Sequence, residues 1–217
     1  MKRHILAATL AVAVHAAPAT AQDVANPLTR ADVWAGVGWH HAHVEEAGEY
    51  DDWYHRSASG TVSAGWYFTN HLKTELDLGG TSHGRVYLFS GAFVDGEQTA
   101  RYGWITHSTR MLGVTGQYQF FENAWFHPYV GAGLDLVREQ EQEQLQPVLI
   151  FDRITQRSRV VEPAREESST NILVRPAASM GFKAYMTRRT YFRTDARLRF
   201  SDRIEDVIVR FGVGVDF

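Results

Sequence analysis

The chain has 217 residues, no cysteine and a formal net charge of −3. The missing cysteines exclude a disulfide framework, and they also exclude the lipid-bearing cysteine of an anchored lipoprotein. The slightly acidic balance leaves no basic surplus for nucleic acid, so we expect no nucleic-acid partner.

The start of the chain has the pattern of a secretory signal peptide. Lys2 and Arg3 form a short basic start, residues 5–14 form an apolar run, and residues 19–21 are small, as at a cleavage site. The apolar run is shorter than the roughly 20 residues that a membrane-spanning helix needs. We therefore expect a signal peptide over residues 1–21 and one exported domain over residues 22–217.

The last eleven residues, 207–217, alternate strictly. Valine and phenylalanine occupy one face, whereas Arg210, Asp216 and two glycines occupy the other. A slip of one residue would put Arg210 in lipid, at a cost of about 2–4 kcal/mol near the bilayer midplane. The pattern is typical of the closing strand of a transmembrane β-barrel.

Earlier segments repeat this alternation at lengths that suit tilted membrane strands. The predicted fold is all-β, an eight-stranded antiparallel up-and-down transmembrane β-barrel. A soluble secreted β-sandwich is the alternative, because alternation alone does not say which face meets water. The predicted strands are residues 32–40, 57–68, 72–80, 111–121, 126–137, 172–185, 191–200 and 207–217.

The connections between these strands alternate between short and long. In bacterial barrels the short turns face the periplasm and the long loops face outward, so both termini are expected in the periplasm. The short turns are 69–71, 122–124 and 187–189; the outer loops are 42–56, 81–110, 138–170 and the shorter 201–205.

Aromatic residues gather beside the short turns, as in the girdle of a membrane barrel. An aromatic soluble core is the alternative, but core aromatics would lie in the middle of the strands. The predicted girdle consists of Trp66, Phe68, Phe120, Phe121, Trp125, Phe126, Tyr191, Phe192 and Phe217.

Four segments carry a resemblance to a known family: Gly65–Asn70, Glu75–Asp77, His127–Gly133 and Gly212–Phe217. They resemble small eight-stranded outer-membrane barrels of the OmpA-like type. The resemblance implies a Gram-negative outer membrane, with its lipid and lipopolysaccharide as surroundings. It also implies insertion by the barrel assembly machinery, for which Phe217 would carry the recognition signal. The chain ends at the barrel, so no peptidoglycan-binding domain is expected.

Charged residues gather on the predicted inward face. Eight strands enclose a lumen only wide enough for side chains, so these groups should pair and plug the barrel. An alternative is a gate, in which Glu75 or Asp77 exchanges partners with Arg197 or Arg199 and opens a narrow path. The predicted inward charges are Asp32, Lys73, Glu75, Asp77, Asp135, Arg175, Lys183, Arg193, Asp195, Arg197, Arg199, Arg210 and Asp216.

The first outer loop holds a cluster of metal-ligand types. His41 and His43 would project from the same strand face, and imidazole with carboxylate suits zinc or a similar cation. A solvated loop that faces anionic lipid headgroups is favoured instead, because no closed set of four ligands is evident, and we assign no metal or cofactor. The cluster consists of His40, His41, His43, Glu45, Glu46, Asp51, Asp52 and His55.

His107 and Ser108 raise the possibility of a lipid-modifying hydrolase. A serine nucleophile needs a base within hydrogen-bond reach and a third group that orients the base, and no spacing identifies that set. We therefore expect no catalysis.

The third outer loop contains alternating Glu and Gln over 139–144, and arginines follow it at 153, 157, 159 and 165. An extended hairpin with cross-strand charge pairs and a disordered loop remain equal alternatives. Either form offers a surface for an unidentified extracellular ligand. The expected role is therefore structural or interactive. A narrow channel for small solutes is the alternative, and a lipid A-modifying enzyme is a third.

Overall fold

The computed structural model describes residues 30–44, 52–94, 97–120, 125–152 and 156–217. The predicted signal peptide, 1–21, lies outside the described residues. Within them no helix is long and apolar enough to cross a membrane. The strands are β1 (Ala31–Val44), β2 (Asp52–Tyr67), β3 (Leu72–Thr81), β4 (Gly84–Val94), β5 (Glu97–Gln119), β6 (Phe126–Leu145), β7 (Val148–Asp152), β8 (Arg157–Glu162), β9 (Arg165–Tyr185), β10 (Thr190–Phe200) and β11 (Ile204–Asp216).

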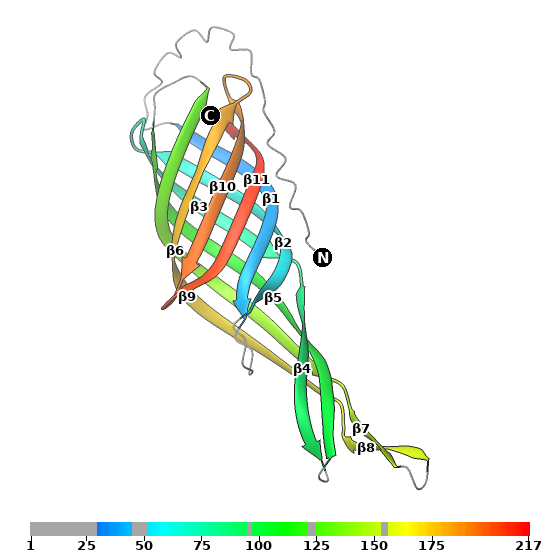
Figure 1. Cartoon of the computed structure of the whole chain (residues 1–217). Coiled ribbons are helices and arrows are strands. Elements are labelled where there is room, and N and C mark those ends of the chain that lie inside the picture. Colours follow the sequence, from blue (N-terminus) through cyan, green and yellow to red (C-terminus); the bar gives the residue numbers. More distant parts are fainter. Residues whose placement is uncertain (1–29, 45–51, 95–96, 121–124, 153–155) are drawn as a thin grey trace, which may run out of the picture.

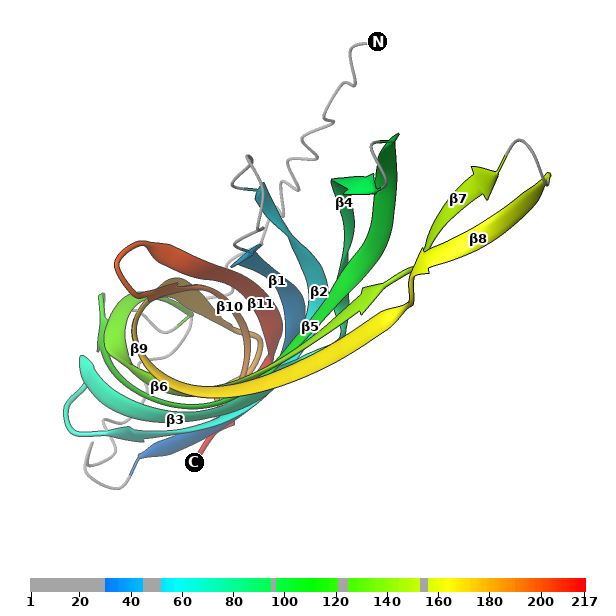
Figure 2. The same cartoon turned by 90° about the horizontal axis from the view of Figure 1, so that it is seen from below.

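Eight of these strands close into an antiparallel barrel. The hydrogen-bonded order runs β3-β2-β1-β11-β10-β9-β6-β5, and a further pairing of β3 with β5 closes the ring. Figure 1 shows the tilted strands from the side, and Figure 2 shows the ring along its axis. The predicted fold is therefore confirmed, and the sandwich alternative is wrong because a sandwich would leave the ring open.

The alternation of residue types explains the barrel wall. In β10 every second side chain, from Tyr191 to Arg199, is buried inside the barrel, and the residues between them lie on the outside. In β11 Val209, Val213 and Val215 are exposed on the outer face, whereas Arg210 is buried. Because the side-chain period of a strand is two, this register places Arg193, Asp195, Arg197, Arg199 and Arg210 inside the barrel and the valines of β11 on its outer face.

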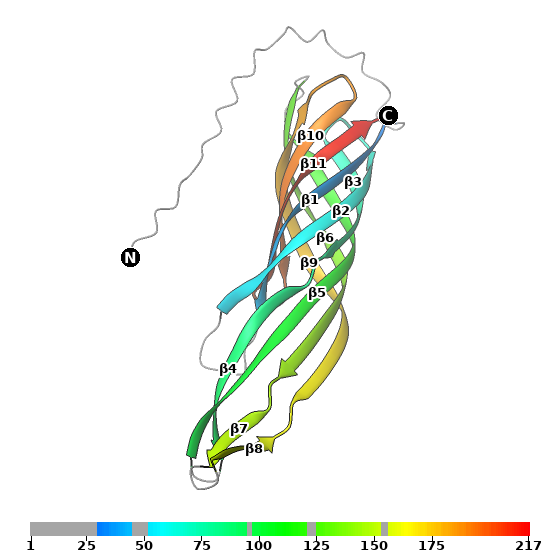
Figure 3. The same cartoon turned by 90° about the vertical axis from the view of Figure 1, so that its right-hand side faces the viewer.

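Two of the predicted outer loops are β-structure. Residues 81–110 contain β4 and the first half of β5, and residues 138–170 contain the ends of β6 and β9 with β7 and β8 between them. We call these extensions the outer ribbons. They continue along the barrel axis well past the ends of the other strands (Figure 3). Their long ladders of backbone hydrogen bonds explain why the two segments, predicted as loops, form strands instead.

The opposite end of the barrel carries the short connections. β2 and β3 are joined by residues 68–71, β9 and β10 by residues 186–189, and the carboxy-terminus lies at the same end (Figure 1). The predicted turn at 122–124 lies outside the described residues. At the ribbon end, β10 and β11 are joined by residues 201–203, a shorter connection than predicted.

Aromatic side chains surround the short-turn end. Trp66, Phe68, Phe120, Trp125 and Phe217 are all exposed there, which is the position of an interfacial aromatic belt. One assignment to this belt is wrong: Tyr191 is fully buried in the lumen, because its position in β10 has inward parity. Phe121, also assigned to the belt, lies outside the described residues.

Candidate functional site

The lumen at the short-turn end is organised around Asp32 of β1. The Lys73 ammonium donates to both carboxylate oxygens, at 3.0 and 2.9 Å, and Lys183 donates to Asp32 as well. The hydroxyls of Tyr67 and Tyr191 each donate to the same carboxylate at 3.1 Å. These side chains come from five different strands. Asp32 of β1 therefore links this end of the barrel to side chains of β2, β3, β9 and β10.

Glu75 and Arg193 form the next layer. Arg193 donates to both oxygens of Glu75, at 2.5 and 2.9 Å, and Lys73 lies 2.6 Å from the same carboxylate. The Arg193 guanidinium also donates to the Tyr129 hydroxyl at 2.7 Å and lies 4.3 Å from the ring centre of Trp34. A bidentate pair that is also stacked on an aromatic ring uses both the fork geometry and the flat faces of arginine.

The middle of the lumen contains two linked arginine pairs. Arg210 donates to both oxygens of Asp195, at 2.6 and 2.8 Å, and Arg197 donates to Asp135 at 2.9 Å. Asp77 joins the two pairs, because it accepts from Arg210 at 3.2 Å and from Arg197 at 3.1 Å. All five groups are buried. The five side chains therefore form one linked set of ion pairs that spans the lumen at this height.

Glycines make room for these large groups. A Cβ atom on Gly65 would overlap the Asp32 carboxylate and Lys73, and one on Gly113 would overlap Asp135 and Arg197. Interiors of folded proteins are closely packed and have few voids. A large charged side chain therefore fits only where a neighbouring residue has no side chain. The glycines at inward positions thus belong to the packing of the charged lumen.

The ribbon end of the lumen is closed by a smaller set of groups. Met111, Val137 and Ile208 form a buried apolar cluster. Beyond it, Asp206 lies 3.1 Å from Arg199 and accepts from Arg175 at 3.0 Å. Arg175 also pairs with Glu139 at 2.9 Å. The lumen therefore changes from charged to apolar and back to charged along its axis.

Three members of this arrangement were missed from the sequence. His40 is buried and lies 2.5 Å from Asp206 and 3.1 Å from Ser57. Arg30 pairs with Asp216, which also accepts from the Tyr185 hydroxyl at 2.5 Å. Parity could have found His40 and Asp206, since both share the inward register of their strands. Asp206 was missed because the predicted strand began at residue 207, whereas β11 begins at Ile204, and Arg30 was missed because it precedes β1.

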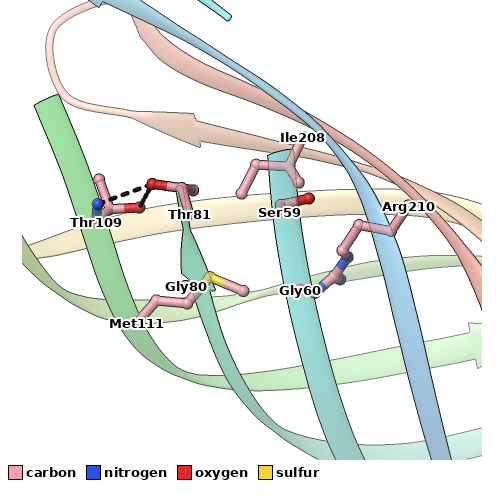
Figure 4. Close-up of a pocket in the computed structure, with 8 residues that line it drawn as sticks. All are labelled: Ser59, Gly60, Gly80, Thr81, Thr109, Met111, Ile208 and Arg210. Atoms are coloured by element: carbon pink, nitrogen blue, oxygen red, sulfur yellow. Dashed lines mark hydrogen bonds between the residues drawn. The ribbon is translucent and has the colours of Figure 1, made fainter. Parts of the chain in front are cut away.

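A small cavity lies between the central arginine layer and the apolar cluster. Its volume is about 10 Å³, close to the least space that one water molecule requires. Figure 4 shows it between Arg210, Met111 and Ile208, beside a hydrogen bond of 2.9 Å from the Thr109 amide to the Thr81 hydroxyl. The cavity could hold a water but is too small for a solute.

Polar side chains line another part of the lumen wall. Thr115, Gln117 and Ser179 surround the inward side of Gly131. Their buried side-chain oxygens and nitrogens have no hydrogen-bond partner among the described residues. Such groups are usually satisfied by ordered water. This wall is therefore a hydrophilic and uncharged part of the interior.

Of the two acids considered for the gate, Glu75 has other partners than predicted, whereas Asp77 has one of those predicted. Glu75 contacts Arg193 and Lys73, and it contacts neither Arg197 nor Arg199. Asp77 does pair with Arg197, but both groups have second partners. The error with Glu75 follows from counting inward positions without their height, because Arg193 is four residues closer than Arg197 to the short-turn end of β10. Arg175 lies at the ribbon-end rim and is only partly buried.

The histidine cluster is divided by strand parity. His40 points into the lumen, whereas His41 and His43 lie on the partly exposed outer face. Among the described side chains no group of three or more histidine, cysteine, aspartate or glutamate residues could hold a metal ion. Glu45, Glu46 and Asp51 lie outside the described residues, as do the side chains of Asp52 and His55.

His107 and Ser108 lie on opposite faces of β5. The His107 ring is buried and stacks at 6.3 Å on the ring of His40, whereas Ser108 has outward parity. Neighbouring residues of one strand cannot direct their side chains at a common point. His107 therefore cannot act as the base for a Ser108 nucleophile in this geometry.

Glutamates line the inner face of the β6 ribbon. Glu143 lies directly opposite Glu167 of β9, so like charges face each other across the ribbon. Of the arginines considered as partners for this stretch, Arg165 lies opposite β6 but faces Leu145, and Arg157 and Arg159 lie in β8, which pairs with β7. Arg153 lies outside the described residues. Burial, and then the neighbouring charge of Glu143, raise the pKa of Glu141 above its usual range.

An antiparallel eight-stranded barrel with an apolar outer band, an aromatic belt and a charged interior defines a transmembrane barrel of the outer-membrane class. The sequence agrees, since residues 5–217 match the model of the outer membrane protein beta-barrel domain. The chain belongs to this family.

Solved structures share the fold. Neisserial surface protein A is 17% identical with a TM-score of 0.52, and the match covers 86% of this chain and 97% of that one. The amino-terminal barrel domain of Pseudomonas aeruginosa OprF is 14% identical with a TM-score of 0.48, over 87% of this chain and 97% of that one. No curated protein matches the sequence. The likeness to Neisserial surface protein A shows the barrel fold alone.

Proposed function

We propose that this protein is a non-conducting outer-membrane barrel that stabilises the envelope and presents its outer ribbons outside the cell. The observation that carries the proposal is the series of buried ion pairs in the lumen, which involve Asp32, Glu75, Asp77, Asp135 and Asp195 and, beyond the apolar cluster, Asp206. Each of these buried acids has a base within 4 Å, and a solute would have to separate several pairs at once. Breaking one buried pair costs several kcal/mol.

The outer ribbons support the interactive part of the role. The outer ribbons carry exposed large apolar side chains although they extend beyond the lipid-facing part of the barrel. These side chains are Tyr87, Tyr102, Leu149 and Phe151. Clusters of exposed apolar residues mark surfaces for partners. We infer that the ribbons are the contact surface for an extracellular ligand or a neighbouring protein.

Labelling of intact cells tests the presentation. The native chain contains no cysteine, so Phe151→Cys in β7 and Asn70→Cys in the short turn each give one unique thiol. A membrane-impermeant maleimide should label the first variant in intact cells and the second only after the outer membrane is opened. Labelling of Asn70→Cys alone in intact cells would reverse the orientation and contradict the proposal.

Membrane insertion is part of the proposed function. The exposed aromatic side chain of Phe217 ends the closing strand, and its amide donates to the carbonyl of Ala31 at 2.8 Å. This arrangement supports a role of Phe217 as the signal for the barrel assembly machinery after export by the signal peptide. The surrounding partners would then be outer-membrane lipid and lipopolysaccharide.

A narrow channel is the second candidate. It is favoured by the wall of Thr115, Gln117 and Ser179, whose unsatisfied polar atoms suit a file of water molecules. Conductance separates the two candidates, because a file of water beside intact ion pairs would pass current.

We propose no catalysis. The opposite faces of His107 and Ser108 support this. Replacing both residues should leave the acylation pattern of the host's lipid A unchanged, and a changed pattern in mass spectra would establish the enzymatic alternative.

A further inference from the structure

We propose that Arg110 of β5 and Arg138 of β6 form a binding site for the phosphate of an outer-leaflet lipid, on the outside of the barrel wall. The leaflet follows from the orientation in the proposed function. The site itself depends on three observations about the wall, which concern charge, height and shape.

The first observation is an uncompensated pair of like charges. Arg110 and Arg138 are directly opposite each other in the β5–β6 ladder, and both are exposed. Side chains opposite each other in an antiparallel ladder have Cβ atoms about 5 Å apart, and like charges there are destabilising. Neither guanidinium has an ion pair or hydrogen bond with a described side chain. An anion between the two would convert this repulsion into attraction.

The second observation is the height of the pair. The outward residues one step closer to the short-turn end form a single cross-strand row of exposed apolar side chains, and the row one step farther away is polar. Arg110 and Arg138 therefore mark the edge of the lipid band, where headgroups lie. The apolar row consists of Val62, Leu78, Leu112, Leu136 and Val174, and the polar row includes Ser108, Gln140 and Thr170.

The third observation is a bare patch of wall beside the pair. Gly80 of β3 lies opposite Arg110, and Gly60 of β2 lies opposite Gly80. Figure 4 shows these two glycines on neighbouring strands. A Cβ atom on Gly60 would meet no atom within 4 Å, so the outer surface there is open. The missing side chains give a bulky headgroup access to the backbone next to the two guanidinium groups.

These features together fit a phosphate with attached acyl chains. Each guanidinium can donate two parallel hydrogen bonds to phosphate oxygens. The acyl chains would lie on the apolar row below, and the headgroup would lie on the glycines. A free phosphate would use only the guanidinium groups, so the lipid should bind more tightly than the ion.

The test uses the full chain refolded in detergent micelles. Diphosphoryl lipid A is added, and the melting temperature is followed by the heat-dependent gel shift. Wild type should be stabilised by this lipid, whereas Arg110→Gln and Arg138→Gln should bind it roughly tenfold to a hundredfold more weakly. Arg189→Gln, in the exposed short turn at the other end, is the matched control and should respond as wild type does.

A charge reversal distinguishes binding from a general loss of stability. Arg138→Glu gives Arg110 an opposite charge, so without lipid this variant should melt at or above the wild-type temperature. It should nevertheless lose the response to diphosphoryl lipid A. A structural role of the arginines would lower the melting temperature in both conditions.

Three results would overturn the proposal. The arginine variants could keep the full wild-type response, or dephosphorylated lipid A with the same acyl chains could stabilise the wild type equally well. Inorganic phosphate alone could also bind as tightly as the lipid, which would make this a site for a free ion. None of these outcomes depends on whether the lumen conducts, so the site and the proposed function fail separately.

Discussion

Glu75 is the side chain on which the charged lumen depends most visibly. It receives Arg193 through two hydrogen bonds and Lys73 through a third contact, all fully buried. A buried ion pair of this kind adds little net stability compared with apolar packing, yet removing one partner leaves a charge with no water to solvate it. The residues of the lumen therefore form a set in which each depends on its neighbours.

Replacement of Glu75 by Gln should be strongly destabilising. Arg193 and Lys73 would keep their positive charges, and the neutral amide can balance neither, so we expect a loss of about 3–5 kcal/mol. Urea unfolding of the refolded protein in lipid vesicles measures it. The surface control Arg189→Gln should change stability by less than about 0.5 kcal/mol, and an equally small loss for Glu75→Gln would refute this account of the lumen.

Glu141 gives the ribbon a dependence on pH. Its pKa is raised above the ordinary value of 4.5 by burial and by Glu143, so in the pH window between the two values only the folded ribbon holds the proton. Stability should then fall as pH rises through this window. Glu141→Gln should slow hydrogen exchange of β6 amides at neutral pH, and the difference from wild type should disappear in acid. A constant difference at all pH values would argue against titration of Glu141.

At the scale of elements, the sequence was most informative where the two faces of a strand have opposite chemistry. The eight barrel strands could be predicted because lipid on one side and ion pairs on the other force a strict period of two. The outer ribbons could not, since β6 beyond Arg138 presents Gln on one face and Glu on the other, and neither face is apolar. Pairing of Glu139–Leu145 with β9 depends on backbone hydrogen bonds between distant segments, which composition does not encode.

The same reasoning applies to the candidate site. Parity in each strand identified the inward charges, but parity does not give their height along the barrel axis, which depends on strand tilt and register. The partner of Glu75 was therefore predicted wrongly, and Tyr191 was assigned to the lipid belt although it donates to Asp32. Charged residues at the strand ends, such as Asp206, were missed because the predicted strand boundaries excluded them.

The β7–β8 hairpin should be dispensable for the barrel. These two strands pair only with each other and form a separate two-stranded sheet. Replacing residues 148–162 by a short glycine turn should change the unfolding free energy of the barrel by less than about 1 kcal/mol, since distal hairpins open independently of a core. Urea unfolding with the gel-shift readout tests this, and failure of the shortened protein to fold would show that the hairpin nucleates the barrel.

At the scale of the whole molecule, the chain must reach the membrane before any contact in the lumen can form. Phe217 is 70% exposed at the end of β11. Phe217→Ala should therefore cost the refolded protein no more than about 1 kcal/mol, but it should greatly reduce the amount assembled in cells. Comparing in vitro stability with outer-membrane yield separates the two effects, and a normal yield would contradict the assembly role.

The completed barrel is a closed wall whose lumen contains layers of ion-paired side chains and a buried apolar cluster, and a cavity of about 10 Å³ lies between the central arginines and that cluster. The ion pairs connect β1, β3, β6, β9, β10 and β11 across the lumen. An interior crossed by paired charges suits a barrel whose activity lies on its outer wall and ribbons.

The most direct measurement of this account is ion conductance across a planar bilayer, with protein shown to be folded by its heat-dependent gel shift. The wild type should produce no discrete current steps, because the pairs of Asp77 with Arg197 and Arg210 close the central layer. Stable, reproducible steps from the wild type that change when Arg197 is replaced by Gln would contradict the sealed lumen and establish the channel.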